Sequence, residues 1–337
     1  MPVLVQPLKI LLMKDIFMNT LQERFRGCLL GLAVGDAVGT TLEFRPKGSF
    51  TPIADMIGGG PFRLEPGQWT DDTSMALCLA VSLLECRSFD ADDQMQRYCR
   101  WRDDGYLSSN GRCFDIGNTV SNALRHYKAG GNPYAGSTDA RSAGNGSLMR
   151  LAPIPLFYYP DIEQAVAFAA ESSKTTHGAA ECLDACRLYS QQLIRALNGE
   201  NKAQVLFADG SSFIGEPKIA GIASGHYRDK SEDSIRGTGY VVDCLEAALW
   251  CFWTTDSFCE AILKAANLGD DADTTAAVCG QLAGAYYGSS GIPAVWKQKL
   301  AMGEMIQDLA DRLYQQSQSR TGQTVKNAHS MTTIDNP

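Results

Sequence analysis

The segment DTTAAVCGQLAGAYYG, residues 273–288, carries the pattern that decides the fold. Ala276, Gly280, Gly284 and Gly288 recur at intervals of four, so a helix would place them in one row on one face. A row of small residues lets a second backbone approach closely. We therefore expect a tightly packed helix at the centre of the protein.

The remainder of the chain shows helical patterns and little strand-like alternation. Residues with capping side chains, Asp90, Asp161, and Asp256 or Ser257, precede three segments with helical patterns, 92–101, 162–170 and 258–266. Apolar residues also recur at helical spacing after Ala180, at positions Cys182, Cys186, Tyr189, Leu193 and Leu197. The sequence therefore predicts an all-α protein.

Composition excludes several classes of protein. The 337 residues are 45% hydrophobic and 20% charged, which is typical of a globular chain with a substantial core. The net charge of -8 argues against broad binding to nucleic acid or to an anionic membrane. Eleven scattered cysteines favour a reducing, cytoplasmic compartment, and four histidines without zinc-ligand spacing mean that any metal would be bound by oxygen.

The chain divides into three segments. Residues 21–316 contain no linker or repeat and predict one compact domain. Residues 1–20 contain apolar stretches that Pro7 and charged residues interrupt, so they do not predict a membrane span. This extension is either an artefact of a start codon upstream of Met13 or Met18, or an arm that packs on a partner. Residues 317–337 predict a frayed polar tail.

Two acidic clusters each stand at the start of an apolar helix, about 200 residues apart. Oxygen ligands of this kind are preferred by Mg²⁺ and Mn²⁺. The alternative is that the residues only cap their helices. Three acids in four positions exceed what a cap requires, so the two clusters together favour a two-metal site. The clusters are Thr70, Asp71, Asp72 and Thr73, and Asp270, Asp271, Asp273 and Thr274.

Three further segments contain candidate site residues. Asp36 and Glu43 lie in a glycine-rich apolar stretch, where buried acids would need partners and exposed acids would not. The turn Gly144–Ser147 offers backbone N–H groups to an anion or is an ordinary turn without the lysine of a P-loop. His177 is either a structural residue or a site residue.

Seven segments, taken in order, resemble the ADP-ribosylglycohydrolase family, in particular the dinitrogenase-reductase-activating type. They are distributed over residues 24–288. The segments are RFRGCLLGLAVGDAVGTTLEF, WTDDTSMALCLAVSLLE, FDIGNTV, GNGSLMRLAPIPL, TTHGAAECLDACRLY, GTGYVVDCLEAALWCF and NLGDDADTTAAVCGQLAGAYYG. The resemblance implies a single all-α domain with a cleft that holds two Mg²⁺ ions, or Mn²⁺ in their place.

The resemblance also implies a role for each matching residue. It assigns the metal ions to Thr70, Asp71, Asp72, Asp271, Asp273 and Thr274. It places Asp36 near the metals, Gly144, Asn145, Gly146 and Ser147 at the diphosphate, and His177 and Tyr240 beside the nucleoside. The general base is left open among Asp72, Asp115 and Glu43.

One position departs from the family pattern, because Asp270 stands where the family commonly has a glycine. Asp tolerates left-handed backbone angles better than most residues, so the turn can form with one added negative charge. The resemblance therefore implies an active enzyme.

The activity implied is metal-dependent removal of ADP-ribose from a modified protein, with arginine as the expected linkage. Other ADP-ribose linkages and ADP-ribosylated dinitrogenase reductase are alternative substrates. A further alternative is an immunity protein that neutralises an ADP-ribosyltransferase toxin by hydrolysis, by blocking its active site with residues 1–20, or by both.

Overall fold

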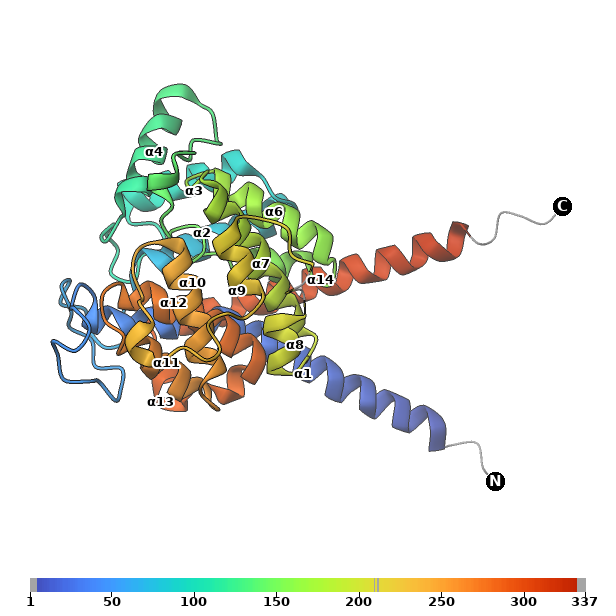
Figure 1. Ribbon diagram of the computed structural model, residues 1–337. Helices are drawn as coiled ribbons and strands as arrows, with labels where there is room; N and C mark the ends of the chain where they lie inside the picture. The colour runs from blue at the N-terminus through green and yellow to red at the C-terminus, as the bar shows by residue number, and fades with distance from the viewer. Residues whose placement is uncertain (1–4, 209, 211, 332–337) are drawn as a thin grey trace.

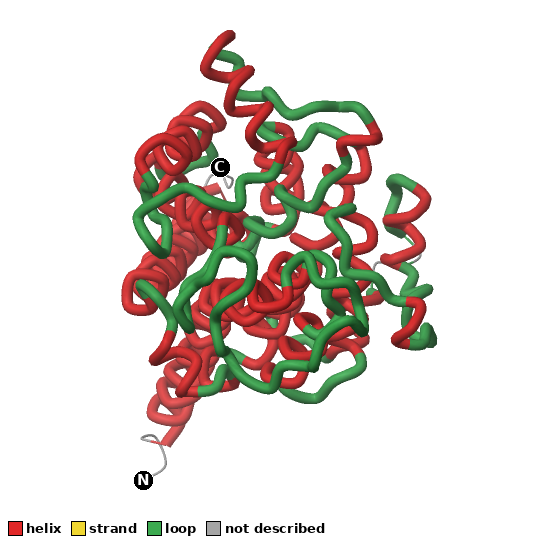
Figure 2. The backbone as a smooth tube through the Cα atoms, turned by 90° about the vertical axis from the view of Figure 1, so that its left-hand side faces the viewer, coloured by secondary structure: helices red, strands yellow, loops and turns green. Residues whose placement is uncertain are grey.

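The computed structural model describes the backbone of residues 5–208, 210 and 212–331, and within those ranges the side chains of residues 21–320. Helices dominate the described residues, which contain isolated β-bridges but no strand (Figure 2). The all-α prediction is therefore confirmed. The α-helices are α1 (Val5–Gly39), α2 (Asp71–Cys86), α3 (Ala91–Asp104), α4 (Asn118–Gly130), α5 (Pro153–Tyr158), α6 (Ile162–Lys174), α7 (Ala180–Leu197), α8 (Lys202–Phe207), α9 (Pro217–Ala223), α10 (Val241–Trp253), α11 (Phe258–Ala266), α12 (Ala272–Tyr287), α13 (Ala294–Lys299) and α14 (Gly303–Met331).

The predicted helix starts are confirmed at three caps. The Asp90 side chain accepts hydrogen bonds from the backbone at the start of α3, and Asp161 does the same for α6. Of the two candidates before α11, Ser257 is the cap, because its side chain accepts a hydrogen bond from the backbone N–H of Glu260. These bonds satisfy N–H groups that the first turn of a helix leaves without partners.

Helix α12 is the central helix that the small-residue row predicts. All its residues from Ala272 to Ala285 are buried, and α1 packs antiparallel along it. The contact is between backbones: a Cβ atom built on Gly280 would lie 2.0 Å from the carbonyl oxygen of Gly31. Gly288 is not part of the helical row, because it is the C-cap of α12 with a φ of 73°. Close packing of this kind requires small residues on both helices.

A second row of glycines on α1 faces the row on α12. Gly27, Gly31, Gly35 and Gly39 also recur at intervals of four. A Cβ atom on any of them would come within 2.1–2.3 Å of a carbonyl oxygen of α12. We call the two facing rows the glycine seam. The seam fixes the position of α1 relative to α12 and therefore the distance between the residues at their ends.

The two terminal helices extend beyond the body of the protein (Figure 1). The backbone of α1 is helical from Val5, and that of α14 is helical to Met331, so α14 includes part of the segment expected as a frayed tail. The side chains of residues 1–20 and 321–337 lie outside the described residues. The division at residues 20 and 316 stays a prediction.

The cysteines and the helix lengths bear on the setting of the protein. All eleven cysteines are free thiols. None of the described helices combines the length and the apolar character needed to cross a bilayer. Cytoplasmic location stays a prediction.

The glycine seam predicts that Gly31→Ala destabilises the fold. The new methyl group would lie 2.2 Å from the Gly280 carbonyl oxygen, so the two helices would have to separate. We expect a loss of about 1–3 kcal/mol in the free energy of unfolding, measured by denaturant titration.

The matched control is Gly130→Ala in α4, where an added Cβ would meet no atom within 4 Å. This variant should be as stable as the original protein or slightly more stable. Equal stability of Gly31→Ala and the original protein would contradict the close backbone contact.

Candidate active site

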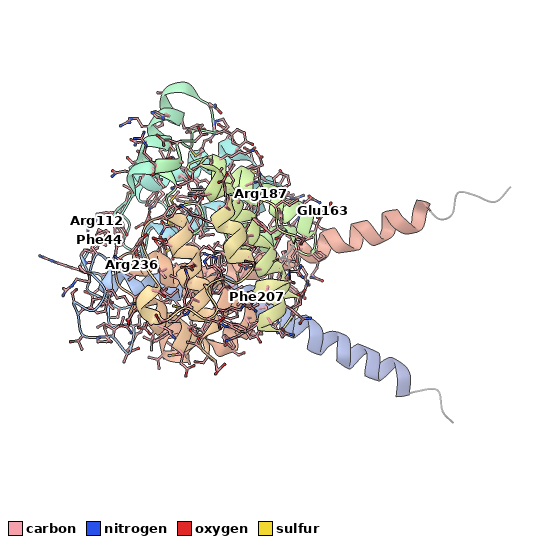
Figure 3. The ribbon with its side chains drawn as sticks, in the orientation of Figure 1. Phe44, Arg112, Glu163, Arg187, Phe207 and Arg236 are labelled. Atoms are coloured by element: carbon pink, nitrogen blue, oxygen red, sulfur yellow. The ribbon has the colours of Figure 1, made fainter. Side chains whose placement is uncertain are left out.

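The site lies in a cleft of about 930 Å³ at the end of the glycine seam. Its lining residues come from the loops that follow α1, precede α4 and α5, and surround the starts of α10 and α12. Loops gather on the side of the molecule shown in Figure 2, which is the left-hand side of Figure 1. The cleft residues Phe44 and Arg236 lie on this same side in Figure 3.

The two predicted acidic clusters come together at the starts of α2 and α12. The Thr70 hydroxyl lies 3.4 Å from an oxygen of Asp273, and the Thr274 hydroxyl lies 3.3 Å from an oxygen of Asp72. Both helices point the positive end of their dipoles at the carboxylates. Two segments about 200 residues apart in the chain thus form one oxygen-rich site.

The acids of the two clusters do not cap their own helices. Thr70 and Asp271 hold the cap positions of α2 and α12, but neither side chain makes a capping hydrogen bond. The start of α2 is capped instead by Asp36 of α1, which accepts the backbone N–H groups of Thr70 (2.9 Å) and Thr73 (3.1 Å) and both hydroxyls. Simple capping therefore does not account for the clustered acids.

Glu43 and Asp115 join the clusters from two loops. Oxygens of Glu43, Asp115 and Asp273 all lie within 4.8 Å of one another. One buried oxygen of each of Glu43, Asp72 and Asp273 has no hydrogen-bond partner among the residues that the structure describes. A cation would give these oxygens a partner and offset the repulsion between the carboxylates, so the residues present fit an oxygen-bound divalent metal.

Burial and mutual repulsion raise the pKa of several of these carboxyl groups. Desolvation is the main cause at each of them, and it raises the pKa of Asp36 to about 6. Desolvation together with the charge of Asp271 raises the pKa of Asp115 to about 7, and desolvation together with Asp115 raises the pKa of Glu43 to about 10. The pKa values of Asp71, Asp72 and Asp273 also lie well above the ordinary range for the same reasons.

Three residues of the predicted anion-binding turn, Gly144, Asn145 and Gly146, line the cleft, whereas the side chain of Ser147 is buried and bonds to Ser173. The N–H groups of Gly144 and Asn145 donate to carbonyl oxygens of Ser142 and Gly239, whereas those of Gly146 and Ser147 have no acceptor among the described residues. The Asn145 amide also donates to Asp271 at 2.7 Å, so the turn is tied to the acidic clusters. Free N–H groups in such a turn can donate hydrogen bonds to an anion.

His177 lies directly under this turn. A Cβ atom on Gly146 would lie 2.7 Å from its ring, and Nδ1 shares a hydrogen bond of 2.9 Å with the hydroxyl of Thr176. Burial and the nearby charge of Arg150 lower the pKa of His177 to about 3, so the ring is neutral at pH 7. A neutral ring in this position supports the turn and adds no charge to the cleft.

A buried arginine, Arg150, supports the turn from behind and was not singled out by the sequence analysis. It donates to the carbonyl oxygen of Gly146 (2.9 Å) and to the hydroxyl of Thr176 (2.8 Å), and lies over the ring of Tyr98. Within the described part of the chain it makes no ion pair with a carboxylate. The signal in the sequence is a single charge in the otherwise apolar run SLMRLAPIPL.

Tyr240 lies beyond the turn, where a second pocket of about 610 Å³ adjoins the cleft through Gly144 and Gly239. Its hydroxyl accepts a hydrogen bond from Lys218 at 2.7 Å and donates to Glu181. Of the two predicted nucleoside residues, His177 therefore lines the cleft and Tyr240 lines the second pocket.

Asp270 lines the cleft and has a left-handed φ of 56°. The turn therefore forms as expected with aspartate in place of glycine. The preceding Gly269 also has a positive φ, 72°.

Two relatives with arginine in their names are similar to most of this chain. The ADP-ribosylarginine hydrolase Tri1 of Pseudomonas putida is 49% identical over 87% of this chain and 78% of its own length. The protein of the same name from Serratia proteamaculans is 45% identical over 87% of this chain and 79% of its own.

A solved structure and a family model agree with these relatives. A structure described as an ADP-ribosylglycohydrolase-related protein complex has a TM-score of 0.78 and is 44% identical, covering 89% of this chain and 99% of its own. The model of the ADP-ribosylglycohydrolase family matches residues 18–323. The chain therefore belongs to the ADP-ribosylglycohydrolase family of enzymes.

Proposed function

We propose that this protein is a metal-dependent hydrolase that removes ADP-ribose from arginine side chains of modified proteins. The observation that carries the proposal is the joining of a neutral anion-binding turn to a buried acidic cluster within one cleft. ADP-ribose has a diphosphate at its centre and a ribose at the end that carries the modified residue. The two ends of the cleft match these two chemical groups.

The turn would bind the diphosphate. Gly146 and Ser147 offer N–H groups without acceptors, and the buried charge of Arg150 lies behind Gly146. A buried cation without a carboxylate partner favours an anion nearby, because the anion offsets the cost of burying the charge. Tyr240 and the second pocket then lie on the side of the nucleoside.

The acidic cluster would hold two divalent cations, Mg²⁺ or Mn²⁺. We assign them to Thr70, Asp71, Asp72, Asp271, Asp273 and Thr274, with Asp36 fixing the start of α2 beside them. Such ions, when bound, stabilise the charge that develops as the N-glycosidic bond breaks. The carboxylates orient the terminal ribose, and their burial excludes bulk water from it.

Among the three carboxyl groups considered as the base, Asp115 is the best placed. It lines the cleft, is partly exposed, and has a left-handed φ of 60° that is unusual for a residue other than glycine. Strained backbone of this kind is common at functional positions. Glu43 also lines the cleft but is nearly fully buried, and Asp72 is buried and is not among the residues that line the cleft. We propose that the Asp115 carboxylate accepts a proton from the water that attacks the ribose carbon and returns it to the departing guanidine nitrogen, and that Glu43 holds Asp115 in place.

Hydrolysis is tested by measuring release of ADP-ribose from an arginine-ADP-ribosylated protein, with Mg²⁺ or with a chelator. We expect release only with the metal, and a loss of at least about 100-fold in Asp72→Ala and Asp271→Ala, since each 1.36 kcal/mol is tenfold in rate. Asp229→Ala, which removes an exposed acid, is the matched control.

Parallel assays with serine-linked ADP-ribose, O-acetyl-ADP-ribose and ADP-ribosylated dinitrogenase reductase define the substrate. Full activity in the chelator would contradict the metal requirement. If the folded protein released ADP-ribose from another conjugate but not from the arginine conjugate, the arginine linkage would be contradicted.

Stability of the metal-free protein should fall as pH rises from 6.5 to 8. In this range the folded state holds protons on Asp115, with a pKa of about 7, and on Glu43, with a pKa of about 10, whereas the unfolded state holds none on them. A folded state that binds more protons loses stability as pH rises. His177 has the opposite effect, which is largest below its ordinary pKa of 6.5 and fades as pH rises above that value.

The measurement is the melting temperature in a chelator and in Mg²⁺. Mg²⁺ should raise the melting temperature more at pH 8 than at pH 6.5, because it offsets the ionised carboxylates. A metal-free melting temperature that does not change over this range would show that the carboxylates do not repel one another as the structure indicates.

We propose a second role, immunity against an ADP-ribosyltransferase toxin, on the observation that the first part of α1 extends beyond the body (Figure 1). The sequence of residues 1–20 is largely apolar, which suits a helix that binds a partner. The enzyme would then reverse the modification, and the extension would cover the active site of the toxin.

Deletion of residues 1–19 tests this role. We expect the truncated protein to keep its hydrolytic rate, because the deleted residues precede the body, and to lose binding to the toxin in a pull-down with purified components. Unchanged binding after the deletion would rule out the extension as the binding element.

A further inference from the structure

The mouth of the cleft has a rim in which arginine and phenylalanine residues lie close together in the sequence. The loop between η1 (Thr40–Leu42) and α2 contributes Phe44, Arg45, Phe62 and Arg63, and the loop between α3 and α4 contributes Arg112 and Phe114. The ring centroids of Phe44 and Phe62 are 6.4 Å apart, and those of Phe62 and Phe114 are 5.2 Å apart. A third loop adds Arg236, which lines the same cleft as Phe44 and Phe62. We call these seven residues the rim.

Phe44 is the most unusual member of the rim. Its side chain is 66% exposed, and its φ of 60° is left-handed. The Phe44 N–H donates to the Asp270 carbonyl at 2.7 Å, and the Asp270 N–H donates to the Arg45 carbonyl at 2.8 Å, so the backbone is held in this state. An exposed aromatic ring on a strained backbone at the mouth of a site is typical of a contact surface.

The arginines of the rim are exposed and without ion pairs. Among the described residues, no carboxylate lies within 4.0 Å of Arg45, Arg63, Arg112 or Arg236. Glu65, Glu232 and Asp233, the exposed acids of the same loops, do not pair with them. Figure 3 shows Arg112, Phe44 and Arg236 on the same edge of the molecule. A protein of net charge -8 thus presents unpaired cations around an acidic cleft.

We propose that the rim binds acidic residues that flank the modified arginine of the target protein, an inference that rests on the proposed function. With the diphosphate at the Gly144–Ser147 turn and the terminal ribose at the acidic cluster, the arginine leaves through the mouth beside Phe44. The backbone of the target protein must then cross the rim. Its acidic side chains pair with the rim arginines, and Phe44 contacts its apolar atoms.

The rings argue for a protein as the occupant in place of a nucleic acid. Single-stranded nucleic acids use aromatic faces on which successive bases stack. Here the rings meet at interplanar angles of 72° and 55°, and Phe62 and Phe114 are partly buried. Phe44 alone among the three presents a largely exposed ring.

The test uses two arginine-ADP-ribosylated peptides that differ only in their flanks, acidic in one and neutral in the other, together with ADP-ribosylated free arginine. The original protein should have a lower KM for the acidic peptide, and this preference should disappear at high salt. The double variant Arg63→Glu with Arg112→Glu should raise KM for the acidic peptide about tenfold, with kcat and free-arginine conjugate cleavage changed less than twofold. Phe44→Ala should raise KM for both peptides.

Arg87→Glu is the matched control. Arg87 is also exposed and without an ion pair, but it lies at the far end of α2, about 24 Å by helix rise from the acidic start of that helix. This variant should not change KM for either peptide.

Four outcomes would overturn the proposal. The first is that the original protein has equal KM values for the two peptides, and the second is that the double variant affects all three substrates equally. The third is that Arg87→Glu raises KM for the acidic peptide as much as the double variant does. The fourth is that single-stranded RNA competes as strongly as an unmodified acidic peptide. If the original protein cleaves no conjugate, the proposed function fails on its own, and the rim is judged by fluorescence anisotropy of the unmodified acidic peptide. Weaker binding by the double variant would then support the rim, and equal binding would reject it.

Discussion

The direct contact between the backbones of α1 and α12 is the constraint on which the rest of the structure depends. Glycines on α1 face glycines and alanines on α12, so the two backbones touch along the whole seam. Asp36 on α1 and Asp273 in the first turn of α12 are thereby brought to the same end, where both hydrogen-bond to Thr70. The geometry of the site follows from the packing of two helices that carry few of its residues.

The same packing keeps together a group of carboxylates that repel one another. Asp36 uses both oxygens to hold the start of α2, and that start holds Asp71 and Asp72 against α12. Burying these acids costs free energy, and the stability of the rest of the fold offsets this cost, as is common for functional sites. The fold itself therefore holds the acidic oxygens in their positions.

Local patterns were enough to predict much of this arrangement. Capping residues predicted helix starts, and the row of small residues on α12 predicted the central helix. The two acidic clusters predicted the oxygen-rich site. Partners distant in the sequence were not predictable in this way. The row from Gly27 to Gly39 becomes meaningful only opposite α12, and Asp36 acts as the cap of another helix. In the sequence Arg150 is only one charge in an apolar run, and its role becomes clear from its contact with the Gly146 turn.

The glycine seam also bears on how invariant positions in such proteins are interpreted. A residue that never changes across homologues is usually taken to touch substrate. At Gly31 and Gly280 a larger residue is disfavoured for a steric reason, since any side chain would clash with the opposite backbone. We therefore expect substitutions among homologues to be as rare along the glycine seam as at the carboxylates of the acidic clusters. An alignment alone would not separate residues restricted by helix packing from residues restricted by a role in the site. The fold separates these two groups.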